Sequence, residues 1–492
     1  MRRAAPRILL GLACLLAANS PAQAQSTDDI NSALQFNFSN PGARSLALAG
    51  AFTARSDDAT AVFANPAGLI QLTQPEFSVD VRDWSFSNPF LKGGVGIGAG
   101  DVERLEFGET SDSLAGLSFG SAFYPSPSGR WVAGVFRHES ANFRTEVRSD
   151  GILLDPADVG KCRGSAKIRP LDGFYDLRID SFGFSAASRL GAGFSLGATL
   201  TMATFDLASR AERLDKLRAE IGCSPPGPLA AESAPCCDFG NEPEDVITFQ
   251  TQFADAGRDE DITWTLGLMW QSPRLVAGVP FLAVGSVYRK GPTFGFLGDT
   301  FFRRGGGPPY SYRSQRVGPD FPTECKVEGR DGCPGTFKVP DVAGIGISIR
   351  PSIRWVVALD YNRVEYSDLA DETLDIVNAD SALGFGRRGR PESFKIDDGD
   401  ELRLGLEYAL LRERSLPDVY LRGGVWFESE HRLRYEGDNV ERRAIWGRGT
   451  DQFHYAAGFG LRFRRFQLDA GLDLSETSDT LSVSSVYYFG RR

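Results

Sequence analysis

Cysteine, histidine and serine are the residue types of this sequence from which covalent, metal-binding or nucleophilic chemistry could be built. The sequence holds seven cysteines. Cys14 lies in an apolar N-terminal stretch, and the other six are Cys162, Cys223, Cys236, Cys237, Cys325 and Cys333. An even set of cysteines in an exported chain favours disulfides. No CxxC pair occurs, and the three histidines lie far from the cysteines in sequence, which argues against a metal site. We expect no metal and no cofactor.

The spacing of the cysteines suggests how they pair. Cys325 and Cys333 lie close together in sequence and are expected to bond to each other. Cys236 and Cys237 are adjacent and cannot easily bond to each other. Their expected partners are therefore Cys223 and Cys162.

A catalytic site for hydrolysis would need a serine, a histidine and an acid near one strand end. His454 beside Tyr455, and Ser485 on the last predicted strand, are available. They form no recognisable motif, and we expect no enzyme activity and no catalytic residue.

The N-terminus predicts export. Three arginines precede an apolar run at residues 8–18, which is the length of a signal-peptide core. Ala22-Gln23-Ala24 supplies small residues for cleavage, so residues 1–24 are expected to be removed. The net charge of −10 becomes −13 without the three arginines, which argues against a nucleic-acid partner.

Alternating polar and apolar residues predict β-strands with two unlike faces. Residues 193–203, 261–270, 401–410 and 466–475 alternate in this way. Each is about as long as the 9–11 residues that a tilted strand needs to cross a bilayer. Beyond the signal peptide no apolar run is long enough for a membrane-spanning helix.

The connections between the predicted strands alternate in length. About fourteen strands are expected between residues 77 and 492. Long connections, which alternate with short ones, are expected at 85–113, 143–178, 207–260, 291–340, 365–399 and 429–452. A soluble sandwich has no reason to keep its long loops at one end, whereas an outer-membrane barrel has short periplasmic turns and long external loops. We therefore predict an antiparallel outer-membrane β-barrel of about 14 strands.

Residues 25–76 precede the first predicted strand and contain short apolar helical patches. Asp57 or Asp58 can cap the patch in DDATAVFANPAGL, and Asn65 ends it because the next residue is proline. The lumen of a fourteen-strand barrel is too wide for strand side chains to fill. We expect this segment to plug the lumen as a helical hatch, with Asp57, Asp58, Phe63, Asn65, Pro66, Ala67, Gly68 and Leu69 as hatch residues. A periplasmic cap or a disordered leader is the alternative.

The segment GARSLALAGAFTARSDDATAVFANPAGLIQL, residues 42–72, resembles the N-terminal signature of the FadL/TodX family of outer-membrane transporters. Residues 339–369 and 402–429 resemble hairpins of the same family. The resemblance implies a fourteen-strand barrel in the outer membrane with an N-terminal hatch. It also implies uptake of a fatty acid or hydrocarbon, which external loops capture and which leaves sideways into membrane lipid. We expect a monomer. A structural or secretion-accessory barrel of the PorV type is the alternative.

A fatty-acid carboxylate would need a cation or N–H donors near its pocket. Candidate ligand-binding residues are Arg44, Phe52 and Arg55 in the hatch and Arg403, Arg422 and Arg462 on polar strand faces. The alternative is that the strand arginines pair with Glu401, Glu407, Asp469 and Asp473. Residues 207–222 read as an amphipathic helix in an external loop, whose Leu214 and Leu217 would cover a groove or pack on the next loop.

Overall fold

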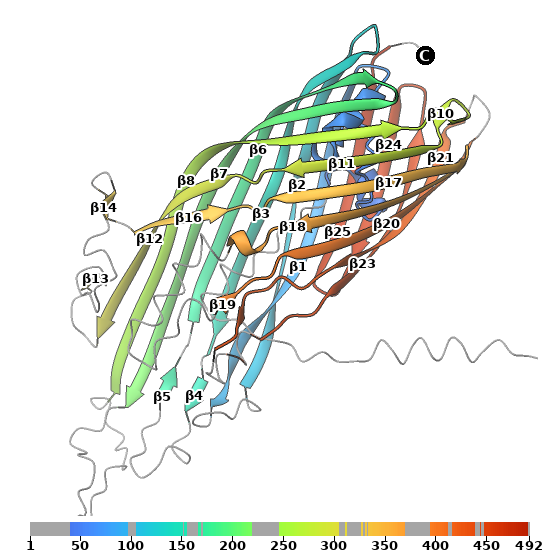
Figure 1. Cartoon of the computed structure of the whole chain (residues 1–492). Helices are drawn as coiled ribbons and strands as arrows, with labels where there is room; N and C mark the ends of the chain where they lie inside the picture. Colours follow the sequence, from blue (N-terminus) through green and yellow to red (C-terminus); the bar gives the residue numbers. More distant parts are fainter. Residues whose placement is uncertain are drawn as a thin grey trace, which may run out of the picture.

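Fourteen antiparallel strands close into a barrel in the computed structural model (Figure 1). The structure describes residues 40–96, 105–150, 171–218, 246–304, 333–369, 394–411, 416–437 and 447–490, with short pieces at 152–154, 166–168, 310–311, 326–327, 330–331 and 443. Residues 1–39, which include the predicted signal peptide, lie outside this range.

The barrel wall follows the order of the chain. Its strands are β1 (Glu76–Gly96), β2 (Leu105–Pro125), β3 (Trp131–Ser149), β6 (Leu171–Gly191), β7 (Phe194–Arg218), β8 (Val246–Gln271), β11 (Leu282–Arg289), β17 (Val342–Ser352), β18 (Trp355–Val364), β20 (Gly399–Leu410), β21 (Asp418–Glu428), β23 (Gln452–Arg462), β24 (Phe466–Leu474) and β25 (Ser478–Tyr488). Pairing of β25 with β1 closes the ring, so the wall has no free edge where these two strands pair, between Glu76 and Phe86 of β1.

Shorter strands accompany the wall. Beyond the break at the end of β11 the chain continues as β12 (Thr293–Arg304), and β16 (Cys333–Lys338) precedes β17. The remaining pieces are β4 (Ile152–Leu154), β5 (Ala166–Ile168), β9 (Leu275–Val276), β10 (Val279–Pro280), β13 (Tyr310–Ser311), β14 (Lys326–Val327), β15 (Arg330–Asp331), β19 (Phe394–Lys395) and β22 (Arg434–Tyr435).

Apolar side chains cover the outside of the barrel. Leu200, Ile262, Leu402 and Phe459 are each at least half exposed and lie on four different strands. The alternating residues on the same strands point inward and are polar, as with buried Thr263. An apolar outer belt over a polar lumen is the pattern of an outer-membrane barrel, and it confirms that prediction.

Three short helices lie inside the barrel and form the hatch (Figure 1). They are α3 (Ala43–Ala47), α4 (Ala61–Ala64) and the 3₁₀ helix η1 (Pro66–Gln71). Helix α3 contacts β21 and β23 to β25, and η1 contacts β3 and β6 to β8. None of the helices among the described residues is long and apolar enough to cross a membrane.

The strands on one side of the barrel are much longer than predicted. β7 has 25 residues and β8 has 26, whereas β24 has 9. The prediction of an amphipathic helix over 207–222 is wrong where the structure describes it, because β7 continues to Arg218. Leu214 and Leu217 lie on β7, where they pair with Gln250 and Ile247 of β8.

Candidate functional site

The inner and outer faces of the longest strands exchange polarity part-way along. On the part of β7 near the short turns, Leu200 is 57% exposed outside and Thr199 is 3% exposed inside. Further out on β7, Asp206 lies outside and Phe205 is buried inside. Neighbouring strands also carry charged side chains on their outer faces beyond this level: Arg144, Glu146, Arg148 and Arg178. Apolar groups face outward where lipid surrounds a barrel, so the exchange marks the outer edge of the membrane.

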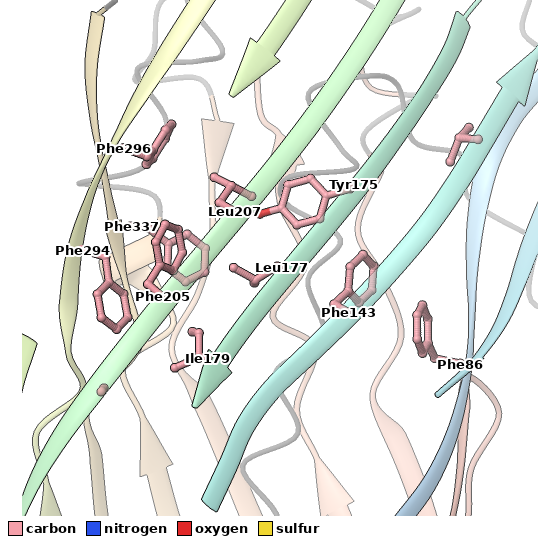
Figure 2. Close-up of a cluster of buried hydrophobic side chains, with 12 residues drawn as sticks. Phe86, Phe143, Tyr175, Leu177, Ile179, Phe205, Leu207, Phe294, Phe296 and Phe337 are labelled. Carbon is pink, nitrogen blue, oxygen red and sulfur yellow. The ribbon is translucent and has the colours of Figure 1, made fainter. Parts of the chain in front are cut away.

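Beyond this level the lumen is lined by buried apolar side chains, which we call the outer chamber (Figure 2). Its members are Phe86, Phe143, Val147, Tyr175, Leu177, Ile179, Ala203, Phe205, Leu207, Phe294, Phe296 and Phe337. Phe205 stacks on Phe294 with ring centroids 4.8 Å apart, and Phe86 on Phe143 at 4.7 Å. These side chains give the outer end of the lumen an apolar lining, and Ile179 carries that lining to the cavity at the hatch.

A small cavity lies where the outer chamber meets the hatch. Its volume of about 60 Å³ is the space of about two water molecules. Ile179 of the chamber and Phe63 of the hatch both line it. Its polar lining consists of three basic side chains and six hydroxyl groups, namely His138, Arg289, Lys290, Ser140, Ser181, Thr199, Thr201, Thr263 and Thr265. The described residues that line the cavity include no aspartate and no glutamate.

Arg289 lines this cavity on the side of the hatch. Nη2 donates a hydrogen bond of 2.6 Å to the carbonyl oxygen of Phe63, and the guanidinium carbon lies 3.4 Å from the centre of the Phe63 ring. Nε and Nη1 are buried and have no hydrogen-bond partner among the described residues. A buried guanidinium with two free donors, and with no ion pair to a carboxylate among the described residues, is suited to bind an oxyanion.

The wall beside this cavity is interrupted between β2 and β3. These strands pair only from Phe119 with His138 to Pro125 with Val132. Further out, β2 remains paired with β1, and β3 remains paired with β6 as far as Ser149. A bulge at Ser140, which lines the cavity, begins this stretch. Within the described residues, β2 and β3 are therefore not paired over their outer halves.

The Asn-Pro-Ala segment of the hatch docks on two glycines of the wall. Gly197 of β7 pairs with Gly267 of β8, and both face the hatch. A Cβ atom at Gly197 would lie 2.2 Å from the backbone nitrogen of Ala67, and one at Gly267 would lie 2.0 Å from Oδ1 of Asn65. Any larger residue would push the hatch off the wall, so these glycines set where it sits.

Asn65 holds this part of the hatch through its side chain. Its Oδ1 accepts a 3.1 Å bond from Ala67 N–H and so caps η1, while Nδ2 donates to the carbonyl oxygens of Thr53 and Leu268. Helix α4 ends at Ala64, as the following Asn-Pro pair predicts.

Comparisons with known proteins bear on this geometry. Neither a family model nor a curated protein sequence matches the chain. A FadL homologue from Pseudomonas aeruginosa is 12% identical over 91% of this chain and 98% of its own, with a TM-score of 0.56. The Ralstonia pickettii toluene transporter TbuX is 16% identical over 92% of this chain and 100% of its own, with a TM-score of 0.54. The P. putida toluene transporter TodX is 14% identical over 93% of this chain and 100% of its own, with a TM-score of 0.55. The chain has the fold of the FadL and TodX channels.

A network of ion pairs fixes the other end of the hatch in this FadL-type barrel. Glu407 of β20 meets three arginines: Arg44 at 3.4 Å, Arg55 at 3.1 Å and Arg422 at 2.8 Å. Arg44 also lies 2.8 Å from Asp57, and Arg55 pairs with the same carboxylate. Four of the residues proposed from the sequence are thus brought together, as one charged cluster that ties the hatch to the wall.

Burial and charge act in opposite directions on the acids of this cluster. Burial would raise the pKa of Asp57, but Arg44 and Arg55 hold it below its usual value. Burial raises the pKa of Asp58 above its usual value, although Arg44 partly offsets this. Asp58 also accepts bonds from the N–H and the hydroxyl of Thr60, one residue before α4. Thr60 is the N-cap of α4 and no side chain caps this helix, so the prediction that Asp57 or Asp58 caps it is wrong; Asp58 binds the N-cap residue instead.

A second cavity lies below the hatch, at the end with the short turns. Its volume is about 320 Å³, and its lining includes Arg44, Asp57, Glu76, Glu407 and Arg422. Arg462 also lines it, and its guanidinium lies 5.3 Å from the centre of the Tyr488 ring. This part of the lumen is charged, in contrast to the outer chamber.

The remaining predicted residues take other positions. Arg403 is buried against Glu401 at 2.9 Å and lies over Trp426, which matches the alternative that strand arginines pair inside the lumen. Phe52 packs in the hatch core with Leu48. Pro66, Ala67, Gly68 and Leu69 are buried in or beside η1. Of the cysteines only Cys333 falls on a described strand, and the predicted disulfides lie outside the described residues.

His454 is part of a structural contact. Its Nδ1 lies 2.8 Å from Asp473, and its ring stacks on Trp426 at 3.7 Å. Among the residues that the structure describes, no group of three or more histidine, cysteine or acidic side chains is placed to hold a metal ion. The solved structures that share this fold are transporter channels.

Sequence reasoning missed Arg289, Lys290 and the hydroxyl groups around them. Arg289 lies on a strand whose polarity looks like that of the others. What distinguishes it is the lack of a partner for its donors, which only the folded arrangement reveals.

Proposed function

We propose that this barrel takes up hydrophobic molecules across the outer membrane, with long-chain fatty acids as the leading substrate class. The observation that carries the proposal is the exchange of polarity along β7, which places an apolar chamber outside the membrane level. An apolar molecule leaves water on entering such a chamber, which is favourable by about 0.8 kcal/mol for each buried methylene group.

The cavity at the hatch supports a substrate with an acidic head group. Arg289 has two free donors, and no acid is among the described lining residues. We propose that the carboxylate binds here while the alkyl chain lies in the outer chamber. The neighbours TbuX and TodX are toluene transporters, so a neutral hydrocarbon is the competing substrate class.

The two cavities support release to the side. Below the hatch, the lumen is lined by the charged residues Arg44, Asp57, Glu407 and Arg422 beside apolar residues such as Leu72 and Val356, so an alkyl chain there would lie against charged groups. Beside the upper cavity, β2 and β3 are unpaired beyond His138. We propose that the substrate leaves through this interruption into outer-membrane lipid and that the protein works as a monomer.

A structural or secretion-accessory barrel is the alternative function. Such a barrel would need neither the outer chamber nor a buried guanidinium with two unpaired donors. Both features have a use only if a ligand with an apolar chain enters.

Uptake by reconstituted protein tests the proposal. Purified barrel in liposomes should speed the transfer of labelled oleate to the vesicle interior or bilayer. Phe205→Asp places a charge inside the chamber and should slow this transfer more than about tenfold, because each buried apolar contact it removes also disfavours the chain. The control Asp206→Asn changes the next residue, on the outer face, and should transfer oleate normally. Wild-type protein that transfers neither oleate nor toluene would rule the proposal out.

A further inference from the structure

The cavity below the hatch is large enough to hold a small molecule. Its volume is about 320 Å³, at the lower end of the range of about 300–1,000 Å³ that ligand pockets span. Val279 and Ile353 line it at the short turns and are 39% and 49% exposed. The cavity is therefore reached from the periplasmic end of the lumen, and the route proposed for uptake does not use it.

The charges around this cavity are only partly paired with one another. Arg44, Arg55 and Arg422 share the carboxylate of Glu407, and Arg44 also pairs with the acids of the hatch. Three further arginines line the cavity and form no ion pair within the part of the chain that the structure describes: Arg350, Arg354 and Arg462. The only other acid in the described lining is Glu76. The unpaired side of the cavity is therefore positively charged.

Two guanidinium groups also present buried donors without acceptors. Nε of Arg55 and Nε of Arg462 have no hydrogen-bond partner among the described residues, and Arg55 as a whole is 8% exposed. A buried N–H group without an acceptor is unfavourable, because it has given up water and gained nothing in return. An oxyanion in the cavity would supply the missing acceptors.

Backbone bonds fix the strand ends that carry the unpaired arginines. The N–H of Arg350 donates to the carbonyl oxygen of Phe281 at 2.8 Å, and the carbonyl oxygen of Arg354 accepts from the N–H of Ala409 at 2.8 Å. Arg462 is the last residue of β23. Apolar side chains lie beside these arginines in the lining, namely Leu72, Val276, Val279, Ile353, Val356 and Leu411.

We propose that this cavity binds a small organic oxyanion from the periplasm, of the phosphate-monoester type. Arg350, Arg354 and Arg462 hold the charged group, and the apolar lining contacts the rest of the molecule. These three cations and the one unpaired acid, Glu76, leave a charge of +2, which a dianion balances. The planar guanidinium groups match the oxygens of a phosphate, to which each can donate two hydrogen bonds.

Protection against phenylglyoxal, which modifies arginine side chains, tests this site on the unaltered full-length barrel in a neutral detergent. Phenyl phosphate at about 10 mM should slow the modification of Arg350 and Arg462 by about tenfold, as read by peptide mass mapping. Phenol has the same ring without the charge and should protect neither arginine. Arg464 is exposed in the turn after β23 and does not line the cavity, so its modification should stay unchanged. Equal modification of Arg350 and Arg462 with and without phenyl phosphate would overturn the site.

Calorimetric titration of variants adds a measure of affinity. Arg350→Met and Arg462→Met should each weaken phenyl phosphate binding by about tenfold or more, since each removes a charge-assisted pair, whereas Arg464→Met should bind as the wild type does. Inorganic phosphate lacks the apolar group and should bind more weakly than phenyl phosphate. Equal affinity for the two would overturn the organic nature of the ligand. Heat-modifiable gel mobility shows that each variant is folded.

A last comparison separates a soluble ligand from a lipid head group. In nanodiscs of phosphatidylcholine, phenyl phosphate should still protect Arg350 and Arg462 from phenylglyoxal. In discs that contain phosphatidylglycerol, the lipid alone should give no protection, because the cavity lies inside the barrel wall. Protection by phosphatidylglycerol without phenyl phosphate would assign these arginines to membrane head groups and overturn the proposal.

Discussion

The polarity exchange along β7 can be tested with one substitution at two positions on the same face. Leu200 and Ala208 both point outward and are eight residues apart. Leu200 lies in the apolar belt, whereas Ala208 lies between exposed Asp206 and Arg210. If the exchange marks the membrane edge, arginine at 200 faces lipid and arginine at 208 faces water.

The expected difference follows from these positions. An arginine on the lipid face of a barrel costs about 2–4 kcal/mol near the bilayer midplane and about 0–1 kcal/mol near the interface. Leu200→Arg should therefore destabilise the barrel by about 2–4 kcal/mol more than Ala208→Arg, because the second side chain stays in water. Each 1.4 kcal/mol is a factor of ten, so the unfolding equilibrium constants should differ by a factor of about 30 to 700.

Reversible urea unfolding in lipid vesicles measures this difference. Leu200→Ala and Ala208→Leu are the uncharged controls, and they separate the effect of charge from that of side-chain size. Equal destabilisation by the two arginines would mean that lipid covers both positions, and the outer chamber would then lie within the membrane.

Three further predictions concern the hatch and its cation. Arg289→Met should weaken oleate binding about 10- to 100-fold, as expected for loss of a charge-assisted pair, and leave the binding of a neutral hydrocarbon of equal length unchanged in a fluorescence displacement assay. Arg350→Met, which removes a charge from the lower cavity, is its control. Glu407→Gln leaves Arg44, Arg55 and Arg422 without their shared carboxylate and should destabilise the protein by about 3–5 kcal/mol and raise single-channel conductance in planar bilayers. Asn65→Ala removes the cap of η1, one bond to the wall at Leu268 and one bond within the hatch at Thr53, so residues 61–67 should lose about 1–2 kcal/mol of protection against hydrogen exchange, while unchanged protection would show that backbone packing alone holds the segment.

The sequence could predict features that depend on local pattern. Alternation in 193–203 placed Thr199 and Leu200 on opposite faces, as observed. The Asn65-Pro66 pair ended α4 where predicted, because proline restricts the residue before it. Pairing of Arg422 with Glu407 and Asp469 also follows from the need of buried charges for partners.

The extension of β7 could not be predicted in the same way. Residues 207–218 are rich in Ala, Leu, Arg, Glu and Lys, which favour a helix in isolation. Pairing with β6 on one side and β8 on the other outweighs this preference. The alternation continues at the start of this stretch, where the apolar Leu207 faces inward and the charged Asp206 and Arg210 face outward. A sequence analysis that looks for strands with an apolar outer face therefore predicts the end of β7 where the inner and outer faces exchange polarity.

The position of the hatch depends on residues that no local pattern marks. Gly197 and Gly267 are two of 55 glycines, and their role follows only from the approach of Asn65 and Ala67. Arg289 likewise looks like any strand arginine until its neighbours are known. The roles of these glycines and of Arg289 depend on contacts with residues that are distant in sequence. A single sequence does not show which distant residues come into contact.

The arrangement of polarity along the lumen gives the proposed route its direction. An alkyl chain in the outer chamber has already left water, so any further step must offer it an equally apolar surface. The cavity below the hatch mixes apolar residues with charged ones, and an alkyl chain that enters it would lie against groups that form ion pairs. Membrane lipid offers the alkyl chain an apolar surface. The unpaired stretch between β2 and β3 leads toward this lipid from the cavity at Arg289. If the substrate leaves sideways, the hatch can stay tight toward ions along the barrel axis. The ion pairs of Glu407 with Arg44, Arg55 and Arg422 hold that end of the hatch to the wall.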